Sequence, residues 1–175
     1  AVAKTQPEYQ INVESLQKVQ PKDLTASEID VRLGATWLPV DVVENFMYEL
    51  LETPYYCKLN IKVNFSPFSS EWNITNKSGD RGNVKANSTY GTSRINAYRI
   101  IEQTLNLKDV RIFDYVIDDD GKKKPVLNKK ETAIAMEKQD AIKQAFKDWI
   151  WNDPERRNRL CEMYNEKFNS IRPRE

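Results

Sequence analysis

The residues best suited to chemistry in this sequence are carboxylates. Three consecutive aspartates, Asp118 to Asp120, could hold a hard divalent cation, because such ions prefer carboxylate oxygens. A calcium loop needs acidic groups at alternating positions and a later Glu, whereas three lysines follow Gly121 directly. Asp-Gly between two alternating segments is typical of a hairpin turn. The sequence therefore favours a turn and leaves a metal site as the alternative.

A second acidic group, Glu28 with Asp30, lies close to Arg32 in the sequence. Such carboxylates could serve acid–base chemistry or hold a metal, but a nearby Arg more often forms an ion pair that locks a turn. The chain of 175 residues has no histidine, which excludes Ser–His and Cys–His nucleophiles within it. Its two cysteines, Cys57 and Cys161, cannot form a zinc site of the usual kind. Lone thiols suit a reducing compartment, and one disulfide stays open as an alternative.

Residues suited to binding are concentrated between residues 77 and 111. This stretch contains seven basic and three acidic residues, whereas the formal net charge of the whole chain is only +1. Tyr90 could stack on a base, and a helix beginning at Thr92 or Ser93 could receive a phosphate at its N-terminus. Glycine motifs for nucleotide phosphates are absent. A solvated basic face is the alternative to a DNA contact. The residues predicted to contact DNA are Lys77, Arg81, Lys85, Arg94 and Arg99, and Lys122 to Lys124 form a second basic spot.

The elements that must position these residues indicate an α+β fold with two small antiparallel hairpins packed with helices. Alternating apolar residues predict strands over 59–65 and 71–75, and over 110–118 and 122–128. Helical spacing predicts helices over 40–53 and 94–107. The polar stretch 76–91 between them is expected to be a long, mobile loop.

The C-terminal third predicts one long amphipathic helix, in which Ile142, Phe146 and Trp149 share a face. Asn152 ends it, and Asp153 with Pro154 predicts the cap and first turn of a second helix. The two helices would form a C-terminal helical hairpin. We expect a flexible linker over 1–12, an α+β domain over 13–127, and this hairpin over 128–175, as a separate domain or as part of the same one. A start without Met and a charged end are what an excised piece or a processed protein would show.

Several long strings give a more specific indication, among them KVQPKDLTASEIDVRLGATWLP, KVNFSPFSSEWNI, YGTSRINAY, DVRIFDYV, IKQAFKDWIW and YNEKFNSIRPRE. From about residue 13 onward the chain resembles a segment of very large bacterial proteins of conjugative elements and phages, including DarB-type antirestriction proteins. That family joins an adenine-specific DNA methylase to a Swi/Snf-type superfamily 2 helicase. The resemblance places this chain between the two, leading toward a helicase lobe that the chain lacks.

The resemblance implies a parent protein that uses ATP, Mg and S-adenosylmethionine in the bacterial cytoplasm. The methylase's [DN]PP[YF] motif and the helicase's ATP-binding motifs are absent from this chain, so no catalytic residue and no cofactor transfers to it. We therefore expect a non-catalytic accessory or connector domain that contacts DNA or braces the helicase lobe. Its partners would be DNA and the neighbouring methylase and helicase domains, with no membrane contact. The alternatives are a protein-interaction or spacer domain without DNA contact, and a carboxylate-dependent nuclease.

Overall fold

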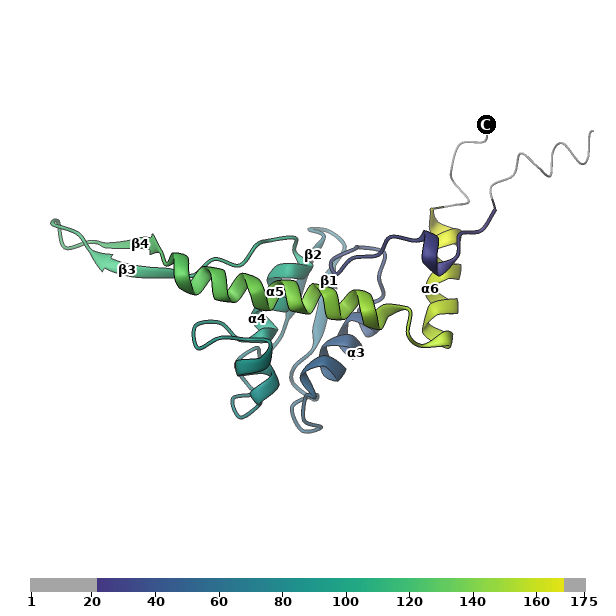
Figure 1. The fold of residues 1–175 in the computed structure, drawn as a ribbon, viewed down its shortest axis with the longest axis horizontal. Helices are drawn as coiled ribbons and strands as arrows, with labels where there is room; N and C mark the ends of the chain where they lie inside the picture. Colours follow the sequence, from purple (N-terminus) through teal and green to yellow (C-terminus); the bar gives the residue numbers. More distant parts are fainter. Residues whose placement is uncertain (1–21, 169–175) are drawn as a thin grey trace, which may run out of the picture. The chain divides into compact units, whose positions relative to one another are not determined.

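The computed structural model describes residues 22–168, which form two compact units (Figure 1). The larger unit is residues 31–152, and the smaller unit combines residues up to 30 with residues from 153 onward. The expected linker over 1–12 and the end of the chain beyond 168 lie outside the described residues. The compact units therefore divide the chain after residue 30 and after residue 152.

The larger unit contains helices and two separate antiparallel hairpins, which confirms the α+β class. Strand β1 pairs with β2, and β3 pairs with β4, so that each sheet has two strands. One turn of π-helix, η2, precedes the second α-helix. The elements are α3 (Val40–Leu51), β1 (Val63–Ser66), β2 (Glu71–Ile74), η2 (Lys85–Thr89), α4 (Ala97–Leu105), β3 (Phe113–Ile117), β4 (Lys123–Leu127) and α5 (Lys129–Ile150).

The core lies where α3 and α4 pack on the long helix α5, and Figure 1 shows both on the same side of it. α3 also covers β1, and α4 covers β2. Buried positions on α5 recur every three or four residues, as the sequence predicted. The Phe46 and Phe146 rings meet edge to face with their centroids 5.1 Å apart. Burying such a side chain stabilises the fold by about 1.5–3 kcal/mol.

Helix side chains bond backbone groups on both outer edges of the β1–β2 hairpin. On β1, the backbone N–H of Val63 donates to Glu44 of α3 at 3.0 Å. On β2, the N–H of Trp72 donates to Asn106 at 2.8 Å, and that of Ile74 donates to Glu102 at 2.9 Å. Edge strands otherwise expose unpaired donors and acceptors to other chains. The outward N–H groups of β2 are therefore satisfied, whereas the outward backbone groups of Phe65 on β1 have no partner among residues 22–168.

Two strand predictions are wrong in part. β1 begins at Val63, because residues 54–61 form consecutive turns that leave Leu59 exposed. β3 begins at Phe113, and its expected buried alternation fails, because Tyr115 is 69% exposed and Ile117 is 73% exposed. The β3–β4 ribbon extends from the N-terminal end of α5, and no helix within residues 22–168 covers it (Figure 1).

The stretch 76–91, expected to be one long loop, is organised around the buried side chain of Asp80. The phenol of Tyr98 and the amide of Asn83 each donate to its Oδ2 at 2.7 Å. Thr53 and Tyr98 share a further hydrogen bond of 2.9 Å. The side chain of Asn83 also donates to the carbonyl of Leu51 at 2.7 Å. These bonds join the stretch to α3 and α4.

The smaller unit contains η1 (Ala26–Glu28) and α6 (Pro154–Lys167). Asp153 caps α6 by accepting from the N–H of Arg156 at 2.8 Å, and Pro154 occupies its first turn, as predicted. The two C-terminal helices are thus confirmed as helices, and they belong to different units. Between residues 22 and 168, no helix combines the length and apolar character that crossing a membrane requires.

Candidate functional site

Three of the five residues predicted to contact DNA line one depression, here called the basic groove. It has a volume of about 320 Å³ and lies between the segment after β2, the start of α4 and the start of β3. Lys77, Arg94 and Arg99 belong to it, and Arg81 and Lys85 do not. Its lining residues are Lys77, Arg94, Ile95, Arg99, Glu102, Gln103, Arg111, Ile112, Phe113 and Tyr115.

Two cations of the groove, Lys77 and Arg94, form ion pairs within the fold. The ammonium of Lys77 lies 2.8 Å from Glu102 and donates to the carbonyl of Ile74 at 3.0 Å. Arg94 donates to Asp114 at 2.8 Å and to the carbonyl of Phe113 at 2.9 Å. The hydrogen bond from Arg94, followed by one from Asn128, lowers the pKa of Asp114 below its ordinary value. Both carboxylates therefore reduce the positive charge of the groove.

The other two cations keep their charge available. Arg99 donates to the hydroxyl of Ser78 at 3.1 Å, which leaves its charge uncompensated. Arg111 was part of the basic stretch but was not among the predicted DNA contacts. In the described part of the chain, neither guanidinium has a carboxylate within ion-pair distance. Arg99 and Arg111 are thus the groups best suited to bind an added anion.

The expected helix start at Thr92 or Ser93 is wrong, and with it the phosphate site proposed there. α4 begins at Ala97 and is capped by Asn96, whose side chain accepts from the N–H of Arg99 at 3.0 Å. Asn96 also donates to the carbonyl of Lys77 at 2.8 Å. Thr92 instead accepts from the N–H groups of Arg94 and Ile95 in a turn. Thr92, the predicted cap residue, therefore stabilises the turn that contains Arg94.

The remaining predicted contacts lie elsewhere. Lys85 begins η2, and its ammonium is 3.8 Å from Glu52 in a separate depression of about 530 Å³. Arg81 lies in the exposed loop before η2. Tyr90, considered for stacking, does not line the groove, whereas Phe113 and Tyr115 do. The aromatic rings near the groove thus come from β3.

A second basic depression, which the sequence did not predict, has a volume of about 280 Å³. Its apolar floor includes Leu33 and Leu107, and four cations surround it against one acid. Lys143 and Lys147 are one turn apart on α5 and so lie on the same face. The residues are far apart in sequence, so no local charge pattern indicates the depression. Its lining is Arg32, Leu33, Thr104, Leu107, Lys108, Asp109, Lys143 and Lys147.

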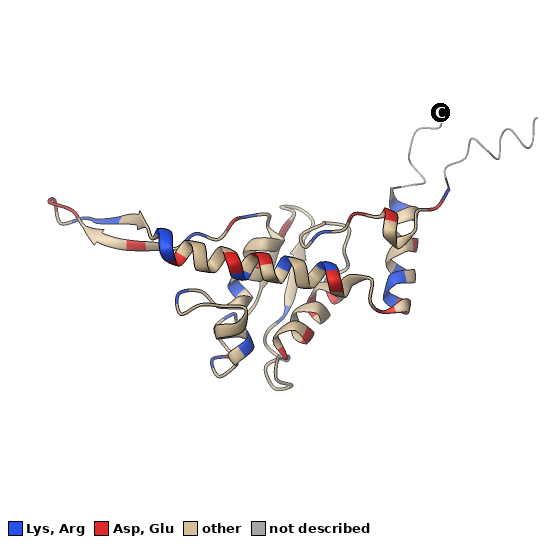
Figure 2. Ribbon diagram, in the orientation of Figure 1, with Lys and Arg blue, Asp and Glu red and all other residues tan. Residues whose placement is uncertain are grey.

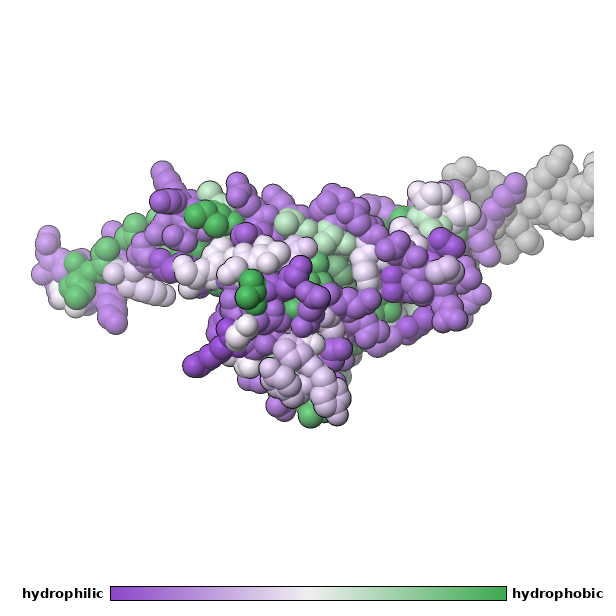
Figure 3. Space-filling view, turned by 60° about the horizontal axis from the view of Figure 1, so that its bottom comes forward, coloured by the Kyte–Doolittle hydropathy of each residue, from purple (hydrophilic) through white to green (hydrophobic). Residues whose placement is uncertain are grey.

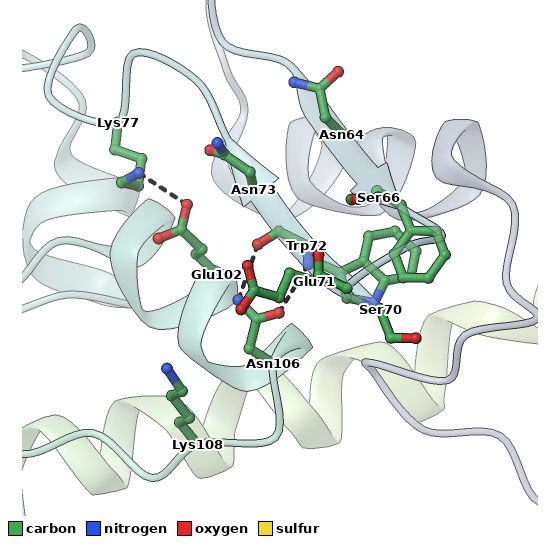
Figure 4. Close-up of a pocket in the computed structure, with 12 residues that line it drawn as sticks. Asn64, Ser66, Ser70, Glu71, Trp72, Asn73, Lys77, Glu102, Asn106 and Lys108 are labelled. Atoms are coloured by element: carbon green, nitrogen blue, oxygen red, sulfur yellow. Dashed lines mark hydrogen bonds and ion pairs between the residues drawn. The ribbon is translucent and has the colours of Figure 1, made fainter.

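A larger depression of about 710 Å³ lies beside β2, and Figure 4 shows its side chains. Asn106 and Glu102 point from α4 toward β2, where they complete the strand edge, and Lys77 pairs with Glu102 (Figure 4). The buried indole N–H of Trp72 has no hydrogen-bond partner among the described residues. Two acids, Glu71 and Glu102, and two lysines, Lys77 and Lys108, line this depression, so it has no excess of positive charge.

Two of the acidic candidates, Asp118 and Glu28, have structural roles. Asp118 accepts from the N–H groups of Asp120 and Lys122 at 3.0 and 2.9 Å, which confirms the hairpin turn. Glu28 closes a capping box by accepting from the backbone N–H and hydroxyl of Thr25, and these bonds lower the pKa of Glu28. Within residues 22–168, no three His, Cys, Asp or Glu side chains are grouped to hold a metal.

The two cysteines are both free thiols. Cys57 is buried in the larger unit, and Cys161 lies on α6 of the smaller unit. Burial, with Asp80 nearby, raises the pKa of the Cys57 thiol, and burial also raises that of Cys161. Raised thiol pKa values disfavour the reactive thiolate at neutral pH.

Residues 32–170 match the family model described as Domain of unknown function (DUF8437). The chain belongs to this family. The DUF8437 match covers both basic depressions and the β3–β4 ribbon. No curated protein and no solved structure matches the chain.

Proposed function

We propose that this domain is a non-catalytic accessory or connector module of a larger DNA-processing protein, and that the basic groove contacts nucleic-acid phosphates. The observation that supports this proposal is the convergence of Lys77, Arg94 and Arg99 with Arg111 on one depression. These cations come from the segment after β2, the loop before α4, α4 itself and the segment before β3. These segments are separate in the sequence, and the tertiary structure brings their side chains to one surface.

The chemistry of the groove fits a phosphate backbone. An arginine guanidinium binds phosphate through two parallel N–H bonds, and both uncompensated cations are arginines. Tyr115 and Phe113 at the side of the groove are partly exposed, so that a base could stack on them. This combination favours a single strand or an opened end over a continuous duplex.

The connector role rests on the family resemblance of the sequence strings. In that setting the methylase and the helicase of the parent supply the catalysis, with their ATP, Mg and S-adenosylmethionine, in the bacterial cytoplasm. This domain then holds DNA between them or braces the first helicase lobe. Its partners are DNA and the neighbouring domains of the same polypeptide.

Fluorescence anisotropy with single-stranded, forked and duplex DNA tests the phosphate contact. We expect the chain to bind at about 50 mM salt and to lose affinity steeply by about 200 mM, because bound cations release counterions from DNA. Arg99→Gln and Arg111→Gln should each lower the slope of log K against log salt by somewhat less than one unit. Neither substitution removes a described contact to a carboxylate, so the fold should stay intact.

Arg81→Gln is the matched control, because it removes the same charge outside the groove. An equal loss in this control would indicate a general electrostatic attraction instead of a site. Absence of binding at about 50 mM salt would overturn the phosphate contact.

The second candidate is a protein-interaction or spacer domain without DNA contact. The observation that favours it is the β3–β4 ribbon, which exposes apolar side chains from both strands (Figure 3). The anisotropy titration separates the two candidates, because a spacer shows no salt-dependent DNA binding.

A further inference from the structure

The two outer edges of the β3–β4 ribbon differ in the backbone groups that they offer, and the hydrogen-bond pattern shows which residues face outward. The N–H of Asp118 donates to the carbonyl of Lys122, and the N–H of Asn128 donates to that of Ile112. The backbone N–H and C=O groups of successive residues point to opposite sides of a strand, so those of residues 112, 114, 116 and 118 point inward, toward β4. Residues 113, 115 and 117 must then point theirs outward. The carbonyl of Phe113 agrees, because it accepts from Arg94 outside the ladder.

The outward groups of Tyr115 and Ile117 have no hydrogen-bond partner in residues 22–168. The opposite edge differs, because Pro125 faces outward across from Tyr115 and has no N–H to donate. β4 is therefore blunted against strand pairing, and β3 is not. In the β1–β2 hairpin, helix side chains bond the outward N–H groups of Val63, Trp72 and Ile74, whereas the outer edge of β3 has one such contact among residues 22–168, from Arg94 to the carbonyl of Phe113.

The two faces of the ribbon also differ. Directly opposed residues share a face, so Phe113, Tyr115 and Ile117 lie together with Leu127, Pro125 and Lys123, the last of which is the only charged residue among them. These side chains are all exposed, and Figure 3 shows hydrophobic residues along the ribbon at the left of the view. Apolar side chains beside an unpaired edge are characteristic of a strand that accepts a neighbour.

Charge is distributed unevenly along the same edge. Arg111 precedes β3, and Arg94 lies at its first residue, whereas Asp118 to Asp120 follow its last residue. Figure 2 shows the acidic turn in red and the basic residues of β4 in blue. The edge is therefore positive at its start and negative at its end. A strand that pairs antiparallel with this edge places its end beside the start of β3, so its end should be negative and its start positive. A second copy of β3 meets this requirement.

We propose that β3 pairs antiparallel with β3 of a second copy of this chain, about a twofold axis at Tyr115. In this register Tyr115 opposes its own counterpart, and Phe113 opposes Ile117 of the second copy, where the carbonyl of Phe113 exchanges its bond from Arg94 for one from the N–H of Ile117. If the same register continues two residues beyond the strand ends, Arg111 lies opposite Asp119 of the second copy. Twofold symmetry repeats that contact at the other end. The result is a four-stranded sheet in which each β4 forms an outer edge blunted by Pro125.

Sedimentation equilibrium of the whole chain, from about 10 µM to about 1 mM, measures the association. A five-residue ladder is short, so we expect a reversible dimer that becomes populated toward the upper end of this range. Tyr115→Pro removes the outward N–H and should leave the chain monomeric throughout. The β3–β4 ladder does not use that N–H, so circular dichroism should stay unchanged.

Charge reversal tests the register separately. Arg111→Asp alone and Asp119→Arg alone should each weaken dimerisation about tenfold, because each creates two like-charge contacts by symmetry. Combining the two should restore the dissociation constant to within about threefold of the original. Lys124→Asp is the control, because Lys124 lies on β4, one strand away from the new contact, and on the other face.

A chain that stays monomeric at about 1 mM overturns the proposal. So does a dimer that tolerates Tyr115→Pro, or one that the double charge exchange fails to restore. Arg111 takes part in both proposals, so Arg99→Gln is the variant that separates them. Arg99 forms no part of the strand contact, and its loss should weaken DNA binding without changing dimerisation.

Discussion

At the scale of single residues, the most constrained group is the carboxyl of Asp80, which is only 7% exposed. A buried carboxyl needs donors, because it has lost its water. Tyr98 and Asn83 supply them at 2.7 Å, and the Cys57 thiol lies 3.8 Å away. Burial raises the pKa of the Tyr98 phenol, so it remains a donor throughout the neutral range. The stretch after β2 is thus connected to α4 through a hydroxyl group.

We expect Tyr98→Phe to lower the free energy of unfolding by about 1–3 kcal/mol, because Asp80 and Thr53 lose a partner without gaining water. Urea denaturation followed by circular dichroism measures the change. Tyr55→Phe serves as the control, because Tyr55 is 81% exposed, and its effect should stay within about 0.5 kcal/mol. Equal effects of the two changes would show that the buried network contributes nothing specific.

At the scale of elements, helix side chains take the place of strands. Asn106 accepts from the N–H of Trp72 at 2.8 Å and donates to its carbonyl at 2.9 Å, as a neighbouring strand would. Glu102 continues the pattern at Ile74. A two-stranded hairpin is marginal alone, so β1 and β2 depend on α3 and α4 for stability. The β3–β4 ribbon lacks such support over most of its length.

Asn106→Leu should therefore destabilise the domain by about 1–3 kcal/mol, because two backbone groups of β2 lose their partner. The amide of Trp72 should exchange its hydrogen faster, and this can be followed by NMR. Asn73→Leu is the matched change at an exposed position of the same strand. Unaltered protection of the Trp72 amide in Asn106→Leu would contradict the proposed role.

At the scale of the whole molecule, the two units are held by different interactions. In the smaller unit, Asn165 accepts from the N–H of Leu24 at 2.7 Å and donates to its carbonyl at 2.8 Å. This exchange joins segments 141 residues apart in sequence. The larger unit has its own core of α3, α4 and α5. Loss of one unit's contacts should then leave the other folded.

Asn165→Ala should release residues 22–30 from α6, since both hydrogen bonds to Leu24 disappear. Hydrogen exchange with mass spectrometry should show lost protection in 22–30 and unchanged protection in α3, α4 and α5. Equal loss of protection in both regions would mean that the units unfold together.

The sequence by itself determined the features that depend on neighbouring residues. Helical spacing was sufficient for α3 and α5, and Asp153 with Pro154 was sufficient for the start of α6. The Asp-Gly turn was also predicted, because its hydrogen bonds join residues at most four apart. In each case the interactions that fix the structure are local, so the pattern is visible along the chain.

Only the tertiary structure decided the rest. The sequence predicted Thr92 or Ser93 as the cap of α4, whereas Asn96 is the cap, and its amide also donates to the distant carbonyl of Lys77. The basic groove joins Lys77, Arg99 and Arg111 across three segments, and Glu102 and Asp114 reduce the charge of Lys77 and Arg94. Side chains of α3 and α4 bond the edges of β1 and β2, and among residues 22–168 the outer edge of β3 has one side-chain contact, from Arg94. Such pairings depend on distances in space, which a linear sequence does not contain.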